Sequence, residues 1–210
     1  MGGRITALKI QKRNTERVNV YIDDRFAFGL AAIEAIHLKV GQELSDAEIA
    51  RLKQKDQVQV AYERSLKFLS YRPRAVAEIQ RYLAEKGFDE PTNKEVVARL
   101  SQSGLLDDDV FARYWIENRD TFKPRGRRAL RYELRQKGVP GLVIDRALTD
   151  YDEGDAAHRA AFARAQKLAR HNDIDALRPK LLAFLSRRGF SFHMARDTVE
   201  SILDELTQEQ

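Results

Sequence analysis

Three short strings of similar sequence decide the fold of this chain: YLAEKGF at residues 82–88, ELRQKGV at residues 133–139 and FLSRRGF at residues 184–190. Their glycines, Gly87, Gly138 and Gly189, lie 51 positions apart. In each string a basic residue precedes the glycine and an apolar residue follows it, which is typical of a helix that ends in a left-handed glycine cap. The strings therefore predict three helices that end in the same way.

The residues around each glycine extend this pattern into a repeat. Before the glycine, apolar residues four positions apart form one helix face in each copy: Ile79 and Leu83, Leu130 and Leu134, and Leu181 and Leu185. After the glycine, a second helix is indicated by matching apolar pairs: Val96 and Leu100, Ile144 and Leu148, and Ala195 and Val199. An amphipathic helix precedes each unit, with these apolar residues: Tyr62, Leu66 and Leu69, then Phe111, Tyr114 and Trp115, then Phe162, Ala165 and Leu168. The chain is therefore expected to be mostly α-helical, with tandem three-helix repeats in three copies.

A proline marks the junction before each glycine-terminated helix, at Pro73, Pro124 and Pro179. Proline suits the first turn of a helix, so we expect each of them to begin the helix that follows. Repeats of about 45 to 50 residues stack on their neighbours in solenoid proteins, so the predicted architecture is an elongated, curved stack.

The N-terminal residues differ from the repeats. Residues 5–10 and 18–22 alternate in polarity around a polar link, which predicts a β-hairpin. Asp23 and Asp24 then turn the chain into a third short strand at residues 26–28, and Ser45 with Glu48 predicts a capping box for a helix that starts near Asp46. We predict four domains: residues 1–57, the N-terminal β-hairpin plus helix module, and three-helix repeats at residues 58–108, 109–152 and 153–210.

The composition excludes several kinds of site. The 210 residues include no cysteine, which excludes disulfides, thiol nucleophiles and cysteine-ligated metals. The four histidines, at positions 37, 158, 171 and 193, have no metal-binding spacing, and no glycine-rich phosphate-binding string occurs. We therefore expect no catalytic residues, no metal site and no cofactor.

No apolar run approaches the roughly 20 residues that a bilayer crossing needs, and the N-terminus lacks the apolar core of a signal peptide. We therefore expect no membrane contact and a cytoplasmic location. A stack with one binding face needs no symmetric partner, so we expect a monomer, with a dimer left open.

Positive charge is concentrated in one segment of the chain. Overall, 37 Lys and Arg stand against 32 Asp and Glu, a formal net charge of +5. Residues 109–151 hold 10 basic and 6 acidic residues, and within residues 123–137 seven basic residues face one acid. Such a run usually marks a solvated helix face, but cations without compensating acids favour a surface for an anionic partner.

The predicted binding residues lie in this segment and at the matching junction of the first copy. Arg127, Arg131 and Arg135 recur at four-residue spacing and form one stripe beside an apolar helix face, with Arg128 on an adjacent row. The complete set predicted to bind a filament or DNA is Arg72, Arg74, Lys123, Arg125, Arg127, Arg128, Arg131, Arg135 and Lys137.

Two motifs have both a structural and a functional interpretation. Asp107, Asp108 and Asp109 are interpreted as helix-capping residues, although clustered carboxylates also suit magnesium. The aromatic residues Phe111, Tyr114, Trp115 and Phe122 are expected to pack in the core, the alternative being that they stack on nucleic-acid bases.

Several of these residues also carry a resemblance to a known family. The string GLLDD at residues 104–108, followed by Phe111, Trp115, Arg119 and the string ELRQKG at residues 133–138, closely resembles the RecX regulatory protein family. The first repeat resembles the same family through YRPR at residues 71–74, Glu78 and Ile79, Leu83, and Lys86 and Gly87. The likeness covers about residues 60–206, and the match of the N-terminal hairpin is weaker.

This resemblance implies a non-enzymatic regulator. Members of the family bind the RecA recombinase filament, lie in its helical groove and restrain its activities in strand exchange and repair. The expected partners are therefore the RecA filament and single- or double-stranded DNA, the latter bound weakly and without sequence preference. Two alternatives remain open: a sequence-specific DNA-binding protein of the helix-turn-helix type and a general single-strand-binding module.

Overall fold

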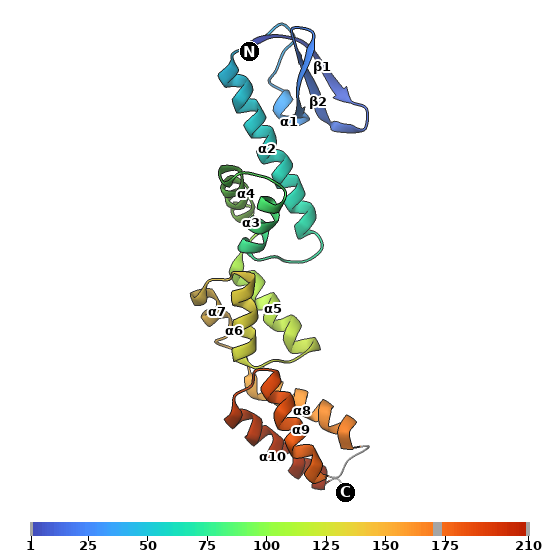
Figure 1. Cartoon of the computed structure of the whole chain (residues 1–210), viewed down its shortest axis with the longest axis vertical. Helices are drawn as coiled ribbons and strands as arrows, with labels where there is room; N and C mark the ends of the chain where they lie inside the picture. The colour runs from blue at the N-terminus through green and yellow to red at the C-terminus, as the bar shows by residue number, and fades with distance from the viewer. Residues whose placement is uncertain (1, 170–173, 209–210) are drawn as a thin grey trace. The chain divides into compact units, whose positions relative to one another are not determined.

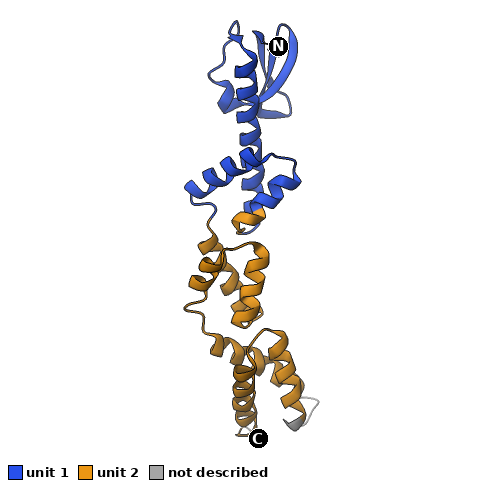
Figure 2. Ribbon diagram, turned by 60° about the vertical axis from the view of Figure 1, so that its left-hand side comes forward, with its two compact units in different colours: residues 1–72, 79–106 blue, residues 73–78, 107–210 orange. Residues whose placement is uncertain are grey.

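The computed structural model describes residues 2–169 and 174–208, so His171 lies outside the described residues (Figure 1). The chain divides into two compact units, residues 1–72 with 79–106 and residues 73–78 with 107–210 (Figure 2). The fold is mostly helical with a small antiparallel sheet at the N-terminus, as predicted. No helix among the described residues has the length and apolarity needed to cross a membrane.

The first unit begins with four antiparallel strands in the order β3-β2-β1-β4. Their bounds are Gly3–Gln11 for β1, Asn14–Ile22 for β2, Arg25–Ala31 for β3 and Glu43–Leu44 for β4. The predicted hairpin and third strand are thus confirmed, and β3 leads into the short helix α1 (Ala32–Ala35). Asp23 and Asp24 both adopt positive φ angles, of 48° and 61°, which a two-residue hairpin turn of type I′ requires.

One long helix, α2 (Asp46–Leu69), follows the sheet. Its predicted capping box is confirmed, since Ser45 Oγ accepts the Glu48 amide at 3.3 Å and Glu48 Oε2 accepts the Ser45 amide at 2.7 Å. Ile49 and Leu52 pack on the core of the sheet, whereas Gln54 donates to Thr92 of α4 at 2.9 Å. This helix runs without a break through position 57, where the first predicted domain ends.

The remaining helices follow in sequence. In the first repeat they are α3 (Val76–Glu85) and α4 (Glu90–Gln102). The second repeat has α5 (Asp108–Phe122), α6 (Arg127–Lys137) and α7 (Gly141–Ala147), and the third has α8 (Glu153–Ala169), α9 (Ile174–Arg187) and α10 (Phe192–Gln208). The apolar pairs predicted on either side of each glycine are buried in all three copies.

The three repeat glycines end their helices in the predicted way. Gly87, Gly138 and Gly189 have φ angles of 82°, 86° and 85°. In each copy the amide of the next residue donates to the carbonyl five residues earlier, at 3.1 to 3.2 Å, as from Val139 to Leu134. This hydrogen bond is characteristic of the Schellman cap, and the apolar residue after the glycine folds back over the end of the helix.

The glycines of the second and third copies also allow close packing between consecutive repeats. A Cβ atom at Gly138 would overlap the Cβ of Ala77 in the first turn of α3, and one at Gly189 would overlap the Cβ of Ala129 in the first turn of α6. Around Gly87, by contrast, a Cβ would meet no atom of the described residues within 4 Å, apart from its chain neighbours.

The prediction that a proline begins each helix is wrong. Pro73 and Pro124 lie three residues before α3 and α6, and Pro179 lies inside α9. The first amide of α3 donates to Asp108 at 2.9 Å, and the first amide of α6 donates to Glu153 at 2.8 Å. A proline at either position would lack the N–H group that makes this contact.

The helix that opens each repeat buries a face that partly differs from the predicted one. In α2 the buried residues are Val58, Ala61 and Ser65, whereas Tyr62, Leu66 and Leu69 are half-buried. In α8 the buried face consists of five alanines, and Ala165 is the one that belongs to the predicted face. Alanine is small enough to admit close helix packing, but it is a weak marker of an apolar face.

The glycine positions give a stability prediction with a built-in control. Replacing Gly87 by alanine places an L residue at a positive φ angle and should cost about 1 to 2 kcal/mol in the free energy of unfolding. Gly138→Ala and Gly189→Ala carry the same strain and in addition overlap the preceding repeat, so each should cost about 1 to 3 kcal/mol more. Urea denaturation followed by far-ultraviolet circular dichroism measures these losses, and equal losses at all three positions would contradict the packing argument.

Candidate binding surface

Helix α6 presents one apolar face and one basic face. Leu130 and Leu134 are fully buried in the core of the second unit. Arg128, Tyr132 and Arg135 share the opposite face because they are four and three residues apart, and all three are exposed. An exposed tyrosine between two exposed arginines offers a stacking surface together with positive charge. Lys123, at the end of α5, is also exposed.

Other cations of the predicted stripe pair within the chain. Arg131 Nη2 lies 2.6 Å from Asp145 Oδ1 of α7. Arg127 Nη2 donates to the carbonyl oxygen of Tyr151, and its Nε lies 3.7 Å from Glu153 Oε2. The predicted stripe consists of Arg127, Arg131 and Arg135. Among the described residues, only Arg135 of these three therefore lacks an intrachain ion pair.

A half-buried cluster forms around Glu133, the one acid in the basic segment. Its carboxylate accepts hydrogen bonds from Trp115 Nε1 at 2.8 Å and Arg119 Nε at 2.8 Å, and forms an ion pair with Arg125 at 3.0 Å. The Arg119 guanidinium and the Lys137 ammonium lie over the Trp115 ring, 4.4 Å and 5.1 Å from its centre. Sequence reasoning missed this cluster, although the single acid among seven bases was a signal for it.

Two of the predicted residues, Arg74 and Lys137, lie close to Glu78. Its Oε1 is 3.1 Å from Lys137 Nζ and 4.0 Å from Arg74 Nη1, and all three side chains are largely buried. Arg72 is half-buried and interacts with other groups of the chain. The nine predicted residues thus divide into a group held by the protein itself and an exposed group consisting of Lys123, Arg128 and Arg135. Their role in binding stays a prediction.

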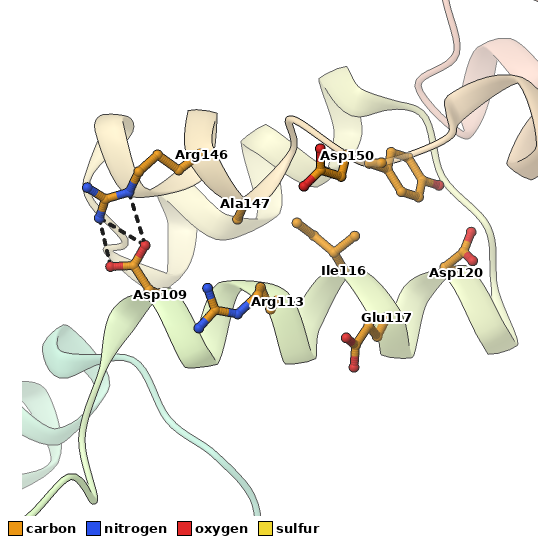
Figure 3. A pocket seen from close by; sticks show the side chains of 9 residues that line it. Asp109, Arg113, Ile116, Glu117, Asp120, Arg146, Ala147 and Asp150 are labelled. Carbon is orange, nitrogen blue, oxygen red and sulfur yellow. Dashed lines mark hydrogen bonds and ion pairs between the residues drawn. The ribbon is translucent and has the colours of Figure 1, made fainter.

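Two of the three consecutive aspartates cap helices: Asp107 caps the helix that follows, as expected, and Asp108 caps α3, whereas Asp109 pairs with an arginine. Asp107 accepts the amides of Asp109 and Val110 at the start of α5, and Asp108 accepts the amide of Val76. Burial raises the pKa of Asp108, and the neighbouring aspartates raise it further, against the lowering effect of the Val76 hydrogen bond. Asp109 forms a bidentate ion pair with Arg146 of α7, at 2.7 and 2.9 Å (Figure 3).

The Asp109–Arg146 pair lies at one end of a groove of about 380 Å³ between α5 and α7 (Figure 3). Ile116, Ala147 and Tyr151 supply its apolar surface, and its carboxylates belong to Asp109, Glu117, Asp120 and Asp150. Burial and the charge of Asp120 raise the pKa of the Tyr151 hydroxyl, which donates to the Arg125 carbonyl at 2.8 Å. In the part of the chain that the structure describes, no group of His, Asp or Glu side chains is arranged to hold a metal ion.

The aromatic residues of α5 have different environments. Phe111 is buried in the core, and Tyr114 and Trp115 are half-buried. The expectation of core packing is wrong for Phe122, which is the last residue of α5 and is 75% exposed. Tyr132 of α6 is 64% exposed.

Comparison with known proteins identifies relatives over nearly the whole chain. Residues 3–45 match the Regulatory protein RecX N-terminal domain, residues 61–100 the first RecX three-helix domain and residues 107–148 the second. Regulatory protein RecX of Bacillus subtilis (strain 168) is 33% identical over 98% of this chain and 81% of that protein. Regulatory protein RecX of Bacillus pumilus (strain SAFR-032) is 30% identical over 98% of this chain and 80% of that protein.

Two solved structures share the fold. One crystal structure of a regulatory protein RecX superposes with a TM-score of 0.74 at 28% identity, over 96% of this chain and 98% of that chain. The crystal structure of RecX from Lactobacillus salivarius superposes with a TM-score of 0.63 at 21% identity, over 70% of this chain and 97% of that chain. At that identity the second similarity supports the fold alone.

The Glu133 cluster predicts a large effect of one substitution on stability. Glu133→Ala removes the acceptor for Trp115 and two arginines in a half-buried site and should lower the free energy of unfolding by about 2 to 4 kcal/mol. The matched control is Glu117→Ala on exposed α5 surface, which should change it by less than about 0.5 kcal/mol. Urea denaturation followed by circular dichroism at 222 nm compares them, and similar losses would mean that the cluster contributes nothing specific.

Proposed function

Because the chain belongs to the RecX regulatory protein family, we propose that it binds the RecA recombinase filament on DNA and inhibits its ATPase, strand-exchange and repair activities. In this proposal it acts as a monomer in the cytoplasm, carries out no reaction itself and needs no cofactor. Family membership supports a regulatory role.

The observation that carries the proposal is a group of exposed cations on α6 and at the end of α5. Lys123, Arg128 and Arg135 lie in solvent with no carboxylate partner among the described residues, whereas neighbouring arginines of the same segment are paired. Three unpaired cations within residues 123–135 concentrate positive charge in one short segment, which supports an external anionic partner. A protein filament on DNA provides such a partner, because its phosphates carry dense negative charge.

Titration of RecA-dependent ATP hydrolysis on single-stranded DNA tests this proposal. We expect the parent chain to inhibit hydrolysis, and the triple variant Lys123→Glu, Arg128→Glu and Arg135→Glu to need about tenfold more protein for the same inhibition, because repulsion replaces attraction. Arg127 and Arg131 stay unchanged because they pair with Glu153 and Asp145 within the fold.

The matched control reverses three exposed cations elsewhere: Arg25→Glu, Lys67→Glu and Arg187→Glu. Three reversals lower the formal net charge by six in both variants, from +5 to −1. A difference between the two variants therefore reports where the charge lies and not how much charge was changed. Equal weakening by both variants would contradict a role for the α6 face. Absence of inhibition by the parent at saturation would contradict the function itself.

Binding to naked DNA distinguishes this proposal from sequence-specific recognition. A filament regulator should bind two duplexes of unrelated sequence with affinities that agree within about threefold, and both affinities should fall steeply as salt increases. A specific helix-turn-helix protein would prefer one site by about a thousandfold or more over random DNA. Fluorescence anisotropy across a panel of randomised duplexes measures this ratio, and a strong preference for one sequence would favour the alternative.

A further inference from the structure

A second basic surface lies in the second unit, apart from the exposed face of α6. It is a groove of about 470 Å³ between the end of α5, the junction before α6 and the helices α8 and α9. None of the nine residues predicted to bind from the sequence lines it. Its charged and aromatic lining residues are Phe122, Arg159, Arg164, Lys167, Phe184 and Arg188.

The groove carries an excess of positive charge. Four of its lining residues are cationic and none is acidic. Arg159 is partly neutralised by Asp120 and Asp155, each at 2.7 Å. Arg164 and Lys167 are exposed and form no ion pair with a carboxylate of the described residues. These two cations, three residues apart on one face of α8, are therefore available to an anion.

Arg188 adds to the positive charge of the groove. Its guanidinium donates to the Pro124 carbonyl at 3.0 Å and is half-buried. Burial lowers its pKa, and the nearby Arg125 lowers it further. An arginine held beside a second arginine in a half-buried position makes the approach of a negatively charged group favourable.

Aromatic rings accompany these cations. Phe184 lies beneath two guanidinium groups, with Arg188 at 4.6 Å and Arg164 at 5.9 Å from its ring centre. Phe122 stands at the rim and is 75% exposed, so most of its ring is free to contact a ligand. A free aromatic ring next to unpaired cations is the combination that holds a base and its phosphate at the same time.

We infer that this groove binds single-stranded nucleic acid, with a base stacked on Phe122 and the adjoining phosphates bound by Arg164 and Lys167. Single strands fit because the faces of their bases are available for stacking, whereas in a duplex they are covered by neighbouring bases. An acidic peptide would satisfy the cations but would leave Phe122 without a partner. Such binding does not require RecA, so it is measured in the absence of RecA.

The stacking part of the inference is tested by fluorescence anisotropy with a labelled oligothymidylate of about 12 nucleotides and an abasic strand of the same length. Phe122→Ala should weaken binding of the oligothymidylate about fivefold or more and leave binding of the abasic strand unchanged. Phe192→Ala is the matched control, because Phe192 is also 75% exposed but lies at the start of α10, outside the groove. An equal effect of both substitutions, or of Phe122→Ala on both strands, would overturn the assignment of Phe122.

The electrostatic part is tested by the salt dependence of the same binding. Arg164→Gln with Lys167→Gln should weaken binding of both strands and reduce the slope of log K against log salt by about 0.7 for each phosphate that the protein no longer neutralises. The control, Lys67→Gln with Arg187→Gln, removes the same charge from exposed positions outside the groove. An unchanged slope in the groove variant would overturn the phosphate contacts.

Competition identifies the class of ligand. Unlabelled oligothymidylate should displace the labelled strand at a concentration at least about tenfold lower than a duplex or a polyglutamate peptide requires. Displacement by polyglutamate at the same charge concentration would show an acidic-peptide groove and overturn the inference. Because RecA is absent, loss of RecA inhibition and loss of strand binding are separate results.

Discussion

The fold of the second unit depends on the contact between a glycine that ends one helix and the first turn of the helix one repeat earlier. Gly138 meets Ala77 and Gly189 meets Ala129, at distances that leave no space for a side chain. The C-terminal ends of α6 and α9, which carry partial negative charge, thus face helix N-termini, which carry partial positive charge. Asp108 and Glu153 complete each contact by accepting the first amide of the preceding glycine-terminated helix. One junction geometry is therefore used twice.

Basic residues near these junctions have two different environments. Arg127 is held at a junction by Glu153 and Tyr151, and Lys137 by Glu78, so these cations stabilise the contact between repeats. Arg128 and Arg135, on another face of the helix, have no such partner among the described residues and are exposed. The basic segment of this chain thus contains cations that stabilise the fold and cations that remain exposed, and the position on the helix decides which.

Local constraints could be read from the sequence, and tertiary ones could not. The caps at Gly87, Gly138 and Gly189 were predictable because a left-handed residue after a helix is a local requirement, as was the capping box at Ser45. The exposure of Phe122 was not predictable, because it depends on which part of α5 the other helices cover. The basic character of α6 was evident from composition. The ion pairs of Arg127 with Glu153 and of Arg131 with Asp145 were not predictable, because they join residues 26 and 14 positions apart.

The repeated junction has a consequence for the history of the chain. Each junction needs a glycine and an acidic residue from one copy. It also needs a small residue in the first turn of the glycine-terminated helix of the copy before it. The second and third copies supply the same glycine and acidic residue. Duplication or loss of the second copy therefore creates a junction of the existing kind with no new side chains. Members of such a lineage can lengthen or shorten in steps of about 50 residues while every retained interface stays intact.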